Sequence, residues 1–406
     1  MRIERFHMER TQSLYENEVR YNLSESGVQP LSTEELLGGG AVAGLLAQPL
    51  KYPESNGSRL LRERIALLYP GATADNVLVT NGTSEANYTA LWRLLGAGDR
   101  AAVMIPSYMQ TNGLARAYGG RADAYRLVPR SARAGEPARW ELDLEGLRRA
   151  VGRRTRVVVV TNPNNPTGAV LTRAEMDAIV DAARAAGAWI VADEVYRGAE
   201  LEGDAESPSF WGAYPRVLVT SGLSKAYGLP GLRIGWIAGP AREIAALWGY
   251  QDYTTLTPSL LSDRLAAAAL EPGRRASILA RTRSIVRRQL PAVLDWIALR
   301  AEVLDAVPPR AGAIALVRYR LPIASVALFE RLRREESVLI TPGGHFGIGR
   351  YFRVGYGYDP GILEQGLARL GAWLDRVRAA GAPRKAGASR KESPARPTAG
   401  RAARQR

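Results

Sequence analysis

The sequence predicts an α/β fold whose largest domain is built on a mostly parallel sheet. Short β-branched runs at 157–160 and 189–192 alternate with helical stretches such as 173–186, as expected of βαβ units. Each run stops at turn-forming or polar residues, which is typical of a buried parallel strand. At 406 residues, the chain exceeds the usual size of a single core, so we expect two domains.

Changes in pattern along the chain predict its domain organisation. Residues 1–50 are a mixed segment that we expect to pack on the small domain and to border the substrate. Residues 51–285 alternate strands and helices and form the large domain. After a helix-rich, Arg-dotted stretch at 274–300, residues 286–380 form a smaller α+β domain with expected strands at 314–319 and 338–340. Residues 381–406 are expected to be a disordered basic tail, since Gly, Ala, Pro and Ser separate its charges.

The net charge of +15 does not indicate specific nucleic-acid binding. The tail alone holds eight Lys and Arg residues against Glu392, and so contributes +7 of this charge. A basic tail binds phosphates non-specifically, but this one lacks interleaved aromatic residues. Arginine also outnumbers lysine throughout the chain, which indicates compositional bias and not a designed patch.

Other composition features exclude several classes of protein. There is no cysteine and there are only two histidines, His7 and His345, so disulfides, thiolate chemistry and a His-rich metal site are not expected. No apolar run approaches the ~18 residues of a membrane span, and we identify no secretory signal. We therefore expect a cytoplasmic protein that binds neither a metal nor a membrane.

Three expected strands deliver polar side chains to one edge of the sheet. Asn165 follows the run at 157–160, Asp193 and Tyr196 follow the run at 189–192, and Lys225 follows a run at 217–220. Ligands in open α/β sheets bind beyond the carboxyl ends of the strands. Lys225 lies in a Gly/Ser loop, where an isolated lysine is more often a surface residue. A lysine that burial or a neighbouring cation deprotonates can instead form a Schiff base.

These motifs, in this order, resemble class I and II aminotransferases, enzymes that depend on pyridoxal 5'-phosphate (PLP). The resemblance covers about residues 22–377 and rests on Asn165-Pro-Thr-Gly168 followed by Asp193, Tyr196, Lys225, Arg233 and Arg353. It implies the PLP-dependent transferase fold (fold type I), with a seven-stranded type of sheet flanked by helices. It also implies a homodimer in which Tyr52 reaches the cofactor phosphate of the neighbouring subunit.

The resemblance implies a role for each matched residue. Lys225 forms the Schiff base and moves the Cα proton, and Asp193 pairs with the pyridinium nitrogen. Asn165 and Tyr196 bind the phenolic oxygen of the ring, and Tyr108 stacks on its face. The phosphate is bound by the start of a helix and by a hydroxyl and a guanidinium; the residues are Gly82, Thr83, Ser84, Ser224 and Arg233.

The residues expected to bind the substrate carboxylate match the family pattern less closely than the residues expected to bind the cofactor. The resemblance implies that Arg353 binds it, together with Asn165, although one arginine among so many is usually a surface charge. The apolar, strand-like context of Arg353 favours a partly buried side chain with an anionic partner. Gly27 resembles the small residue that approaches the same carboxylate, but a turn glycine explains it almost as well. Where relatives carry a phosphate-binding serine, this chain has Gly222; either that hydroxyl is missing or Ser221 replaces it.

The motifs leave the reaction open between two classes. One is transfer of an amino group from an L-amino acid to a 2-oxo acid. The other breaks a different bond by the same Schiff-base chemistry, as a lyase, cyclase or oxidase acting on an amino acid, possibly a cationic one in secondary metabolism. A non-catalytic regulatory role is disfavoured, because Lys225 is intact and no DNA-binding domain precedes residue 22. The substrate side chain is not predicted.

Overall fold

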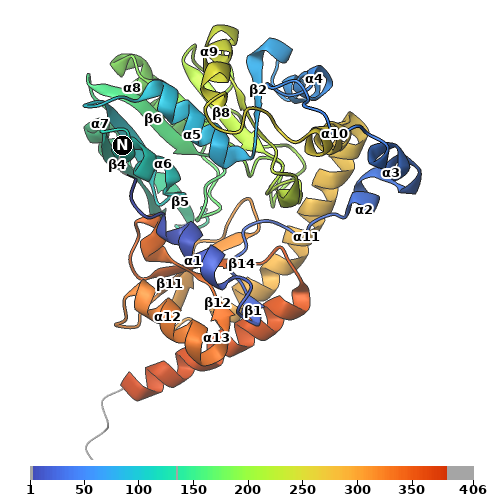
Figure 1. Ribbon diagram of the computed structural model, residues 1–406. Coiled ribbons are helices and arrows are strands. Elements are labelled where there is room, and N and C mark those ends of the chain that lie inside the picture. The colour runs from blue at the N-terminus through green and yellow to red at the C-terminus, as the bar shows by residue number, and fades with distance from the viewer. Residues whose placement is uncertain (1–2, 134–135, 382–406) are drawn as a thin grey trace, which may run out of the picture.

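The computed structural model describes residues 3–133 and 136–381. It has a large α/β part and a smaller α+β part (Figure 1). The predicted tail at 382–406 lies outside the described residues. The helices are α1 (His7–Tyr15), α2 (Thr33–Leu37), α3 (Gly39–Leu46), α4 (Arg59–Ala66), α5 (Thr83–Leu94), α6 (Gln110–Ala117), α7 (Leu144–Ala150), α8 (Arg173–Ala186), α9 (Ala241–Gln251), α10 (Leu260–Ala269), α11 (Pro272–Ala298), α12 (Ser325–Glu336) and α13 (Pro360–Gly381).

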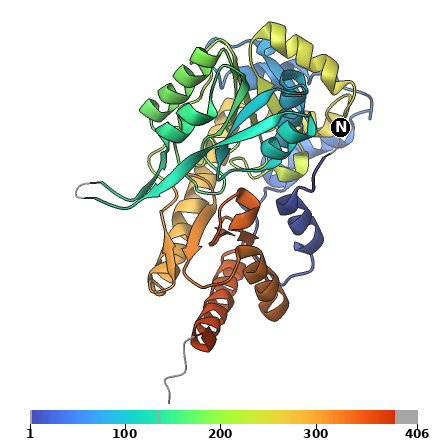
Figure 2. The ribbon, with the colours of Figure 1, turned by 90° about the vertical axis from the view of Figure 1, so that its left-hand side faces the viewer.

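The large sheet has eight strands in the order β2-β9-β8-β7-β6-β3-β4-β5. The five consecutive strands β8-β7-β6-β3-β4 are parallel. Strands β9 and β5 run antiparallel to them, and the edge strand β2 pairs antiparallel with β9. The strands are β2 (Val77–Thr80), β3 (Arg100–Ile105), β4 (Arg121–Arg130), β5 (Arg139–Leu142), β6 (Thr155–Thr161), β7 (Trp189–Asp193), β8 (Val217–Gly222) and β9 (Gly235–Ala238). The mostly parallel sheet is as predicted; β5 adds an eighth strand by pairing with β4 in a hairpin that extends from the body of the molecule (Figure 2).

Helices cover both faces of this sheet, which explains its continuous β-branched runs. Along β6, Val158 and Val160 belong to one buried core, and Val157 and Val159 belong to another. Strand side chains alternate between faces, so a strand that is buried on both sides must be apolar at every position. The predicted strands at 157–160 and 189–192 are confirmed for this reason.

The smaller part is built around a second core. It contains the antiparallel sheet β10-β11-β14-β13 and a parallel pair formed by β1 and β12. The strands are β1 (Tyr21–Asn22), β10 (Leu304–Ala306), β11 (Ile314–Tyr319), β12 (Val338–Leu339), β13 (Thr341–Pro342) and β14 (Tyr351–Gly355). The expected strand at 338–340 is divided, because Ile340 lies between β12 and β13.

The helix α11 runs from one core to the other (Figure 1). Ile278 and Leu279 pack in the large core, whereas Val286 and Val293 pack in the small one. The proposed boundary at residue 285 thus falls inside a continuous helix. The N-terminal segment is also shared between the two parts: β1 pairs with β12 in the small part, but Leu36 of α2 packs in the large core.

The stretch at 23–28 is fixed against β14 and the residues that follow it. The amide of Gly355 donates to the carbonyl of Leu23 at 2.8 Å, and Val28 forms a bridge with Gly357. A Cβ at Gly355 would lie 1.6 Å from the carbonyl oxygen of Glu25. Only glycine therefore allows the N-terminal segment to approach β14 this closely.

We predict that Gly355→Ala lowers the free energy of unfolding by at least about 2 kcal/mol, because the added methyl group forces the two backbones apart. Urea denaturation measures this. The matched control is Gly349→Ala, since a Cβ at Gly349 meets no atom within 4 Å. Equal stability of the two variants would contradict the close approach.

Candidate active site

A cavity of about 280 Å³ lies at the carboxyl edge of the large sheet, and most of the predicted residues line it. Residues of helix α1 also line this cavity, and α1 lies between the large and the smaller part of the molecule (Figure 1). The predicted residues that line it are Thr83, Ser84, Tyr108, Asn165, Asp193, Tyr196, Ser224, Lys225 and Arg233. The strands β6, β7 and β8 and the helix α5 bring these side chains together from distant parts of the sequence.

The Asp193 carboxylate is held rigidly at the end of β7. It accepts hydrogen bonds from Asn87 Nδ2 at 3.0 Å and from the amide of Val195 at 3.1 Å. Asn87 is itself oriented by Thr220, whose hydroxyl donates to it at 2.6 Å. Burial raises the pKa of Asp193, and the two hydrogen bonds and nearby Lys225 oppose that rise. Asn87 was missed by the sequence reasoning, although it lies four residues after Thr83 and therefore on the same face of α5.

The start of α5 and Arg233 form a cationic corner of the cavity. A Cβ at Gly82 would lie 2.3 Å from Arg233 Nη2, so the guanidinium rests directly against the residue that caps the helix. Arg233 also donates to Ser224 Oγ at 3.5 Å. The hydroxyl of Thr83 is buried without a hydrogen-bond partner among the described residues. A helix N-terminus, a guanidinium and free hydroxyls together suit a phosphate dianion.

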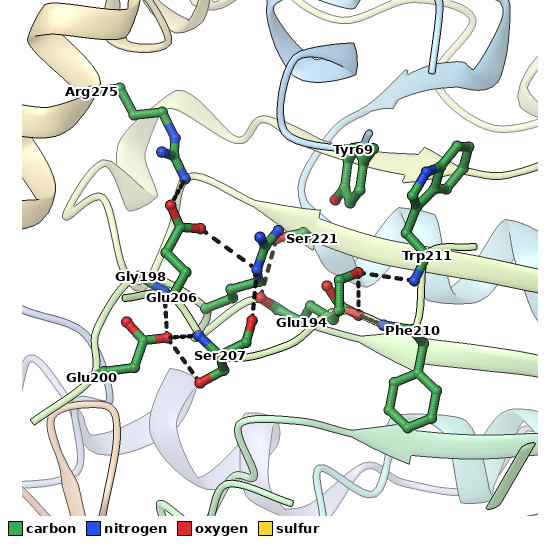
Figure 3. Close-up of polar contacts among 12 residues, drawn as sticks. Tyr69, Glu194, Gly198, Glu200, Glu206, Ser207, Phe210, Trp211, Ser221 and Arg275 are labelled. Carbon is green, nitrogen blue, oxygen red and sulfur yellow. Dashed lines mark hydrogen bonds and ion pairs between the residues drawn. The ribbon is translucent and has the colours of Figure 1, made fainter. Parts of the chain in front are cut away.

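Ser221 does not line this cavity, which corrects the suggestion that it supplies the missing phosphate hydroxyl. Its hydroxyl donates to the carbonyl of Glu194 at 3.3 Å, within the polar cluster of Figure 3. Thr220 faces Asn87, so strand alternation turns Ser221 to the opposite side. Gly222 has little room for a side chain, since a Cβ there would lie 2.5 Å from Thr83 Oγ1.

Arg353 is fully buried beside the cavity and joins three segments of the chain. Its guanidinium donates to Asn165 Oδ1 at 2.8 Å, to the carbonyl of Ser24, and to Thr341 Oγ1 at 3.2 Å. These acceptors are neutral, so the predicted anionic partner is not among them. Burial lowers the pKa of Arg353. Gly27 lies nearby: a Cβ there would be 3.3 Å from the Ser224 carbonyl and 3.9 Å from Lys225 Cδ.

Two predicted tyrosines of this chain reach the cavity and one does not. The Tyr196 side chain is 2% exposed, and its hydroxyl has no hydrogen-bond partner among the described residues. Tyr108 donates to Glu9 Oε1 at 2.8 Å and packs edge-on against Phe6. Tyr52 is 82% exposed and does not line the cavity of its own chain.

The donor set of the cavity fits PLP. Lys225 supplies an amine, Asp193 a buried carboxylate, Tyr196 an unpartnered phenol, and the α5–Arg233 corner a site for a dianion. The fold and the site therefore define a PLP-dependent enzyme of fold type I.

Comparison with known proteins gives the same result. The profile of "Aminotransferase class I and II" matches residues 32–370, and the chain belongs to this family, whose members use PLP. A capreomycidine synthase from Streptomyces vinaceus is 34% identical over 322 residues, which cover 78% of this chain and 79% of that protein.

Two solved structures are similar over nearly their whole length. A PLP-dependent aminotransferase from Streptococcus suis has a TM-score of 0.84 at 30% identity, covering 93% of this chain and 99% of that one. The PLP-dependent cyclase OrfR has a TM-score of 0.81 at 28% identity, covering 93% and 98%. The predicted family, fold class and cofactor are thereby confirmed.

The described residues contain neither a membrane-spanning helix nor a metal-binding cluster. No helix among residues 3–133 and 136–381 is long and apolar enough to cross a membrane. Within the same residues, no cluster of three or more His, Asp or Glu side chains could hold a metal ion.

Glu194, next to Asp193, is buried and does not line the cavity; its contacts form part of the polar cluster in Figure 3. Its Oε1 accepts from Ser209 Oγ and from the amide of Phe210, both at 2.8 Å, while Oε2 has no partner among the described residues. Burial raises the pKa of Glu194 from 4.5 to about 7, although Arg197 and both hydrogen bonds lower it. The carboxyl group of Glu194 is therefore mostly protonated at pH values below about 7.

We predict that the contribution of Glu194 to wild-type stability is lost as the pH rises from about 4.5 to about 7, because the unfolded chain releases this proton at a lower pH than the folded protein does. Glu194→Gln fixes the neutral form, so its stability relative to wild type should increase over this window by up to about 3 kcal/mol. Urea denaturation of the cofactor-free proteins measures this, with exposed Glu364→Gln as control. A pH-independent difference between Glu194→Gln and wild type would contradict the raised pKa.

Proposed function

We propose that the cavity is the active site of an aminotransferase that moves an amino group from an L-amino acid to a 2-oxo acid. The convergence of Lys225, Asp193, Tyr196 and Arg233 on one cavity carries this proposal. PLP, when bound, supplies the electron-withdrawing ring that makes the Cα proton of an amino acid acidic. The remaining chemistry belongs to side chains of this chain.

The cofactor-binding roles follow from the charges and donors around the cavity. Asp193, fixed by Asn87, would keep the ring nitrogen protonated. Tyr196 and the amide nitrogen of Asn165 would donate to the phenolic oxygen, and Tyr108 would pack on the ring. The backbone of Gly82 and the backbone and hydroxyl groups of Thr83 and Ser84, at the start of α5, would hold the phosphate with Ser224 and Arg233.

Lys225 is the proposed catalytic amine. Its Nζ would take the proton from Cα of the substrate and return it to the carbon on the other side of the amino nitrogen. Both positions must lie within hydrogen-bond reach of one flexible side chain, which a lysine in a loop satisfies. The neighbouring backbone of Gly27 leaves room for this movement, because it presents no side chain to Lys225.

Arg353 is the proposed receptor for the substrate α-carboxylate. It now donates to neutral oxygens, and its Nε is buried without a partner among the described residues. A carboxylate offers stronger, charge-assisted hydrogen bonds than a carbonyl does. Substrate binding should therefore displace the contact with the Ser24 carbonyl and retain the contact with Asn165.

A lyase or cyclase reaction is the second candidate, favoured by the similarity to a capreomycidine synthase and to a PLP-dependent cyclase. The two reactions differ in their need for an amino acceptor. An aminotransferase completes its cycle only when a 2-oxo acid is supplied. Continuous turnover of an amino acid without any 2-oxo acid would support the lyase or cyclase reaction.

We predict that Lys225→Ala reduces turnover at least about a thousandfold, because the nucleophile and the proton carrier are both lost. Borohydride should attach the cofactor covalently to the peptide containing Lys225 in the wild type, as mass spectrometry can show. Lys51→Ala, which changes an exposed lysine, is the control and should behave as wild type. A Lys225→Ala variant that retains activity would contradict the assignment.

We also propose a homodimer in which Tyr52 completes the phosphate site of the partner subunit. Tyr52 lies in an exposed apolar stretch with Leu46 and Leu50, which are 80% and 83% exposed. An exposed patch of this kind indicates an interaction surface. The position of Tyr52 away from the cavity of its own chain is what a shared site requires.

We predict that Tyr52→Phe weakens PLP retention and activity, because one phosphate donor is lost. Mixing Tyr52→Phe with inactive Lys225→Ala chains should restore up to about a quarter of wild-type activity, since one site of each heterodimer is intact. Leu14→Ala, an exposed apolar change elsewhere, serves as control. A fully active monomer in sedimentation at the assay concentration would contradict the shared site.

A further inference from the structure

Helix α1 and the segment before Gly27 bring three glutamates to the cavity. Glu9 lies on α1, Glu16 follows its last turn, and Glu25 is two residues before Gly27; all three line the cavity with Lys225. Gln12 fixes the helix against the segment, since its Nε2 donates to the carbonyl of Ser24 at 3.2 Å. The three carboxylates are thus held on one wall of the cavity and are only partly exposed.

These three charges have no counter-ion in the described part of the chain. No ion pair among residues 3–133 and 136–381 involves Glu9, Glu16 or Glu25; Glu9 only accepts from Tyr108. The cavity is lined by four carboxylates and by two cationic side chains, Lys225 and Arg233. Under the proposed function, Asp193, Lys225 and Arg233 are all engaged with the cofactor. The negative charge of the three glutamates therefore remains for the substrate.

The proximity of these carboxylates affects Glu16. Its pKa is raised, first by burial and then by the negative charges of Glu25 and Glu9, and Lys225 opposes this rise. Like charges held close together destabilise one another. A cationic ligand between them relieves this repulsion, whereas an anionic ligand increases it.

The cavity also contains an unpartnered hydroxyl, which the proposed function assigns to the cofactor, and apolar surface. The Tyr196 hydroxyl is buried and has no hydrogen-bond partner among the described residues, although its side chain lines the same cavity. An unpartnered buried hydroxyl is costly. The cavity wall also includes Met8 and Val195, which offer apolar surface for an alkyl chain.

We propose that the amino donor carries a cationic side chain, a guanidinium or an ammonium on an alkyl stem, that Glu9, Glu16 and Glu25 bind. This rests on the proposed function, in which Arg353 takes the α-carboxylate. The opposite charges of the two ends of the substrate then match opposite charges of the site. Amino acids with carboxylate side chains are rejected by repulsion, which is a strong source of specificity.

Steady-state kinetics with matched substrates tests the substrate class. L-Arginine is compared with its neutral isostere L-citrulline, L-lysine with L-norleucine, and both cations with L-aspartate. We expect kcat/KM to favour each cation over its neutral counterpart by roughly tenfold or more, as for loss of a charged hydrogen bond. The relative rates of arginine and lysine distinguish a guanidinium from an ammonium substrate.

Equilibrium binding supplies a measurement that does not depend on turnover. The PLP-loaded wild type is titrated in a calorimeter with δ-guanidinovalerate and δ-ureidovalerate, which cannot react because they lack the amino group. The guanidino compound should bind at least about tenfold more tightly. Glu16→Gln and Glu25→Gln should each reduce this ratio severalfold, and Glu16→Lys should abolish it.

The control is Glu18→Gln, an exposed glutamate close to Glu16 that does not line the cavity. It should leave the ratio unchanged. An enzyme that transaminates neutral or acidic amino acids at least as well as cationic ones overturns the proposal. Equal binding of the two valerates, or no effect of the glutamine variants, overturns it as well. A protein that retains no PLP and transaminates nothing instead overturns the proposed function.

Discussion

The burial of the Arg353 guanidinium is the constraint on which the site depends. A charge removed from water must find hydrogen-bond acceptors, because a buried charged group left without them is more costly than a neutral one. Arg353 finds its acceptors on Asn165 of the large part, Ser24 of the N-terminal segment and Thr341 of the small sheet. One side chain thus fixes the relative positions of three segments that are far apart in sequence. The cavity lies where they meet.

We infer that the N-terminal segment determines which substrates the site accepts. Its path is set by backbone contacts: Gly355 bonds to Leu23, and the absence of a side chain at Gly355 lets Glu25 pass close to β14. The same path places Glu25 at the cavity and directs α1 across its opening. The side of the cavity opposite the cofactor residues is therefore acidic. We infer that selectivity resides in this segment, while the sheet carries the chemistry that the family shares.

The sequence predicts the sheet and the cofactor residues well because both depend on local patterns. A strand buried on both faces must be apolar throughout, so β6, β7 and β8 are visible as β-branched runs. Residues that follow such strands must lie at one edge of the sheet, which brings Asn165, Asp193 and Lys225 together without any knowledge of loops.

What the sequence did not predict depends on contacts between distant segments. Asn87 acts through Asp193, 106 residues away, and only its position on α5 hinted at this. Ser221 was assigned by its distance along the chain from Lys225, but strand alternation turned it away from the cavity. The acidic side of the cavity, formed by Glu9, Glu16 and Glu25, could not be predicted. The glutamates on and after α1 resemble a solvated helix face until the position of the helix is known.

Asp193 and Glu194 are adjacent in sequence, but their carboxyl groups lie in environments that favour different protonation states. Both are buried, and burial raises the pKa of each. Asp193 receives hydrogen bonds from Asn87 and Val195 and lies near the cation of Lys225, all of which favour its charged form. Glu194 faces away, toward Ser209 and Phe210, and one of its oxygens has no partner among the described residues. The charged form is thus favoured at Asp193, where the proposed function places the cofactor nitrogen, and the protonated form is favoured at Glu194, which does not line the cavity.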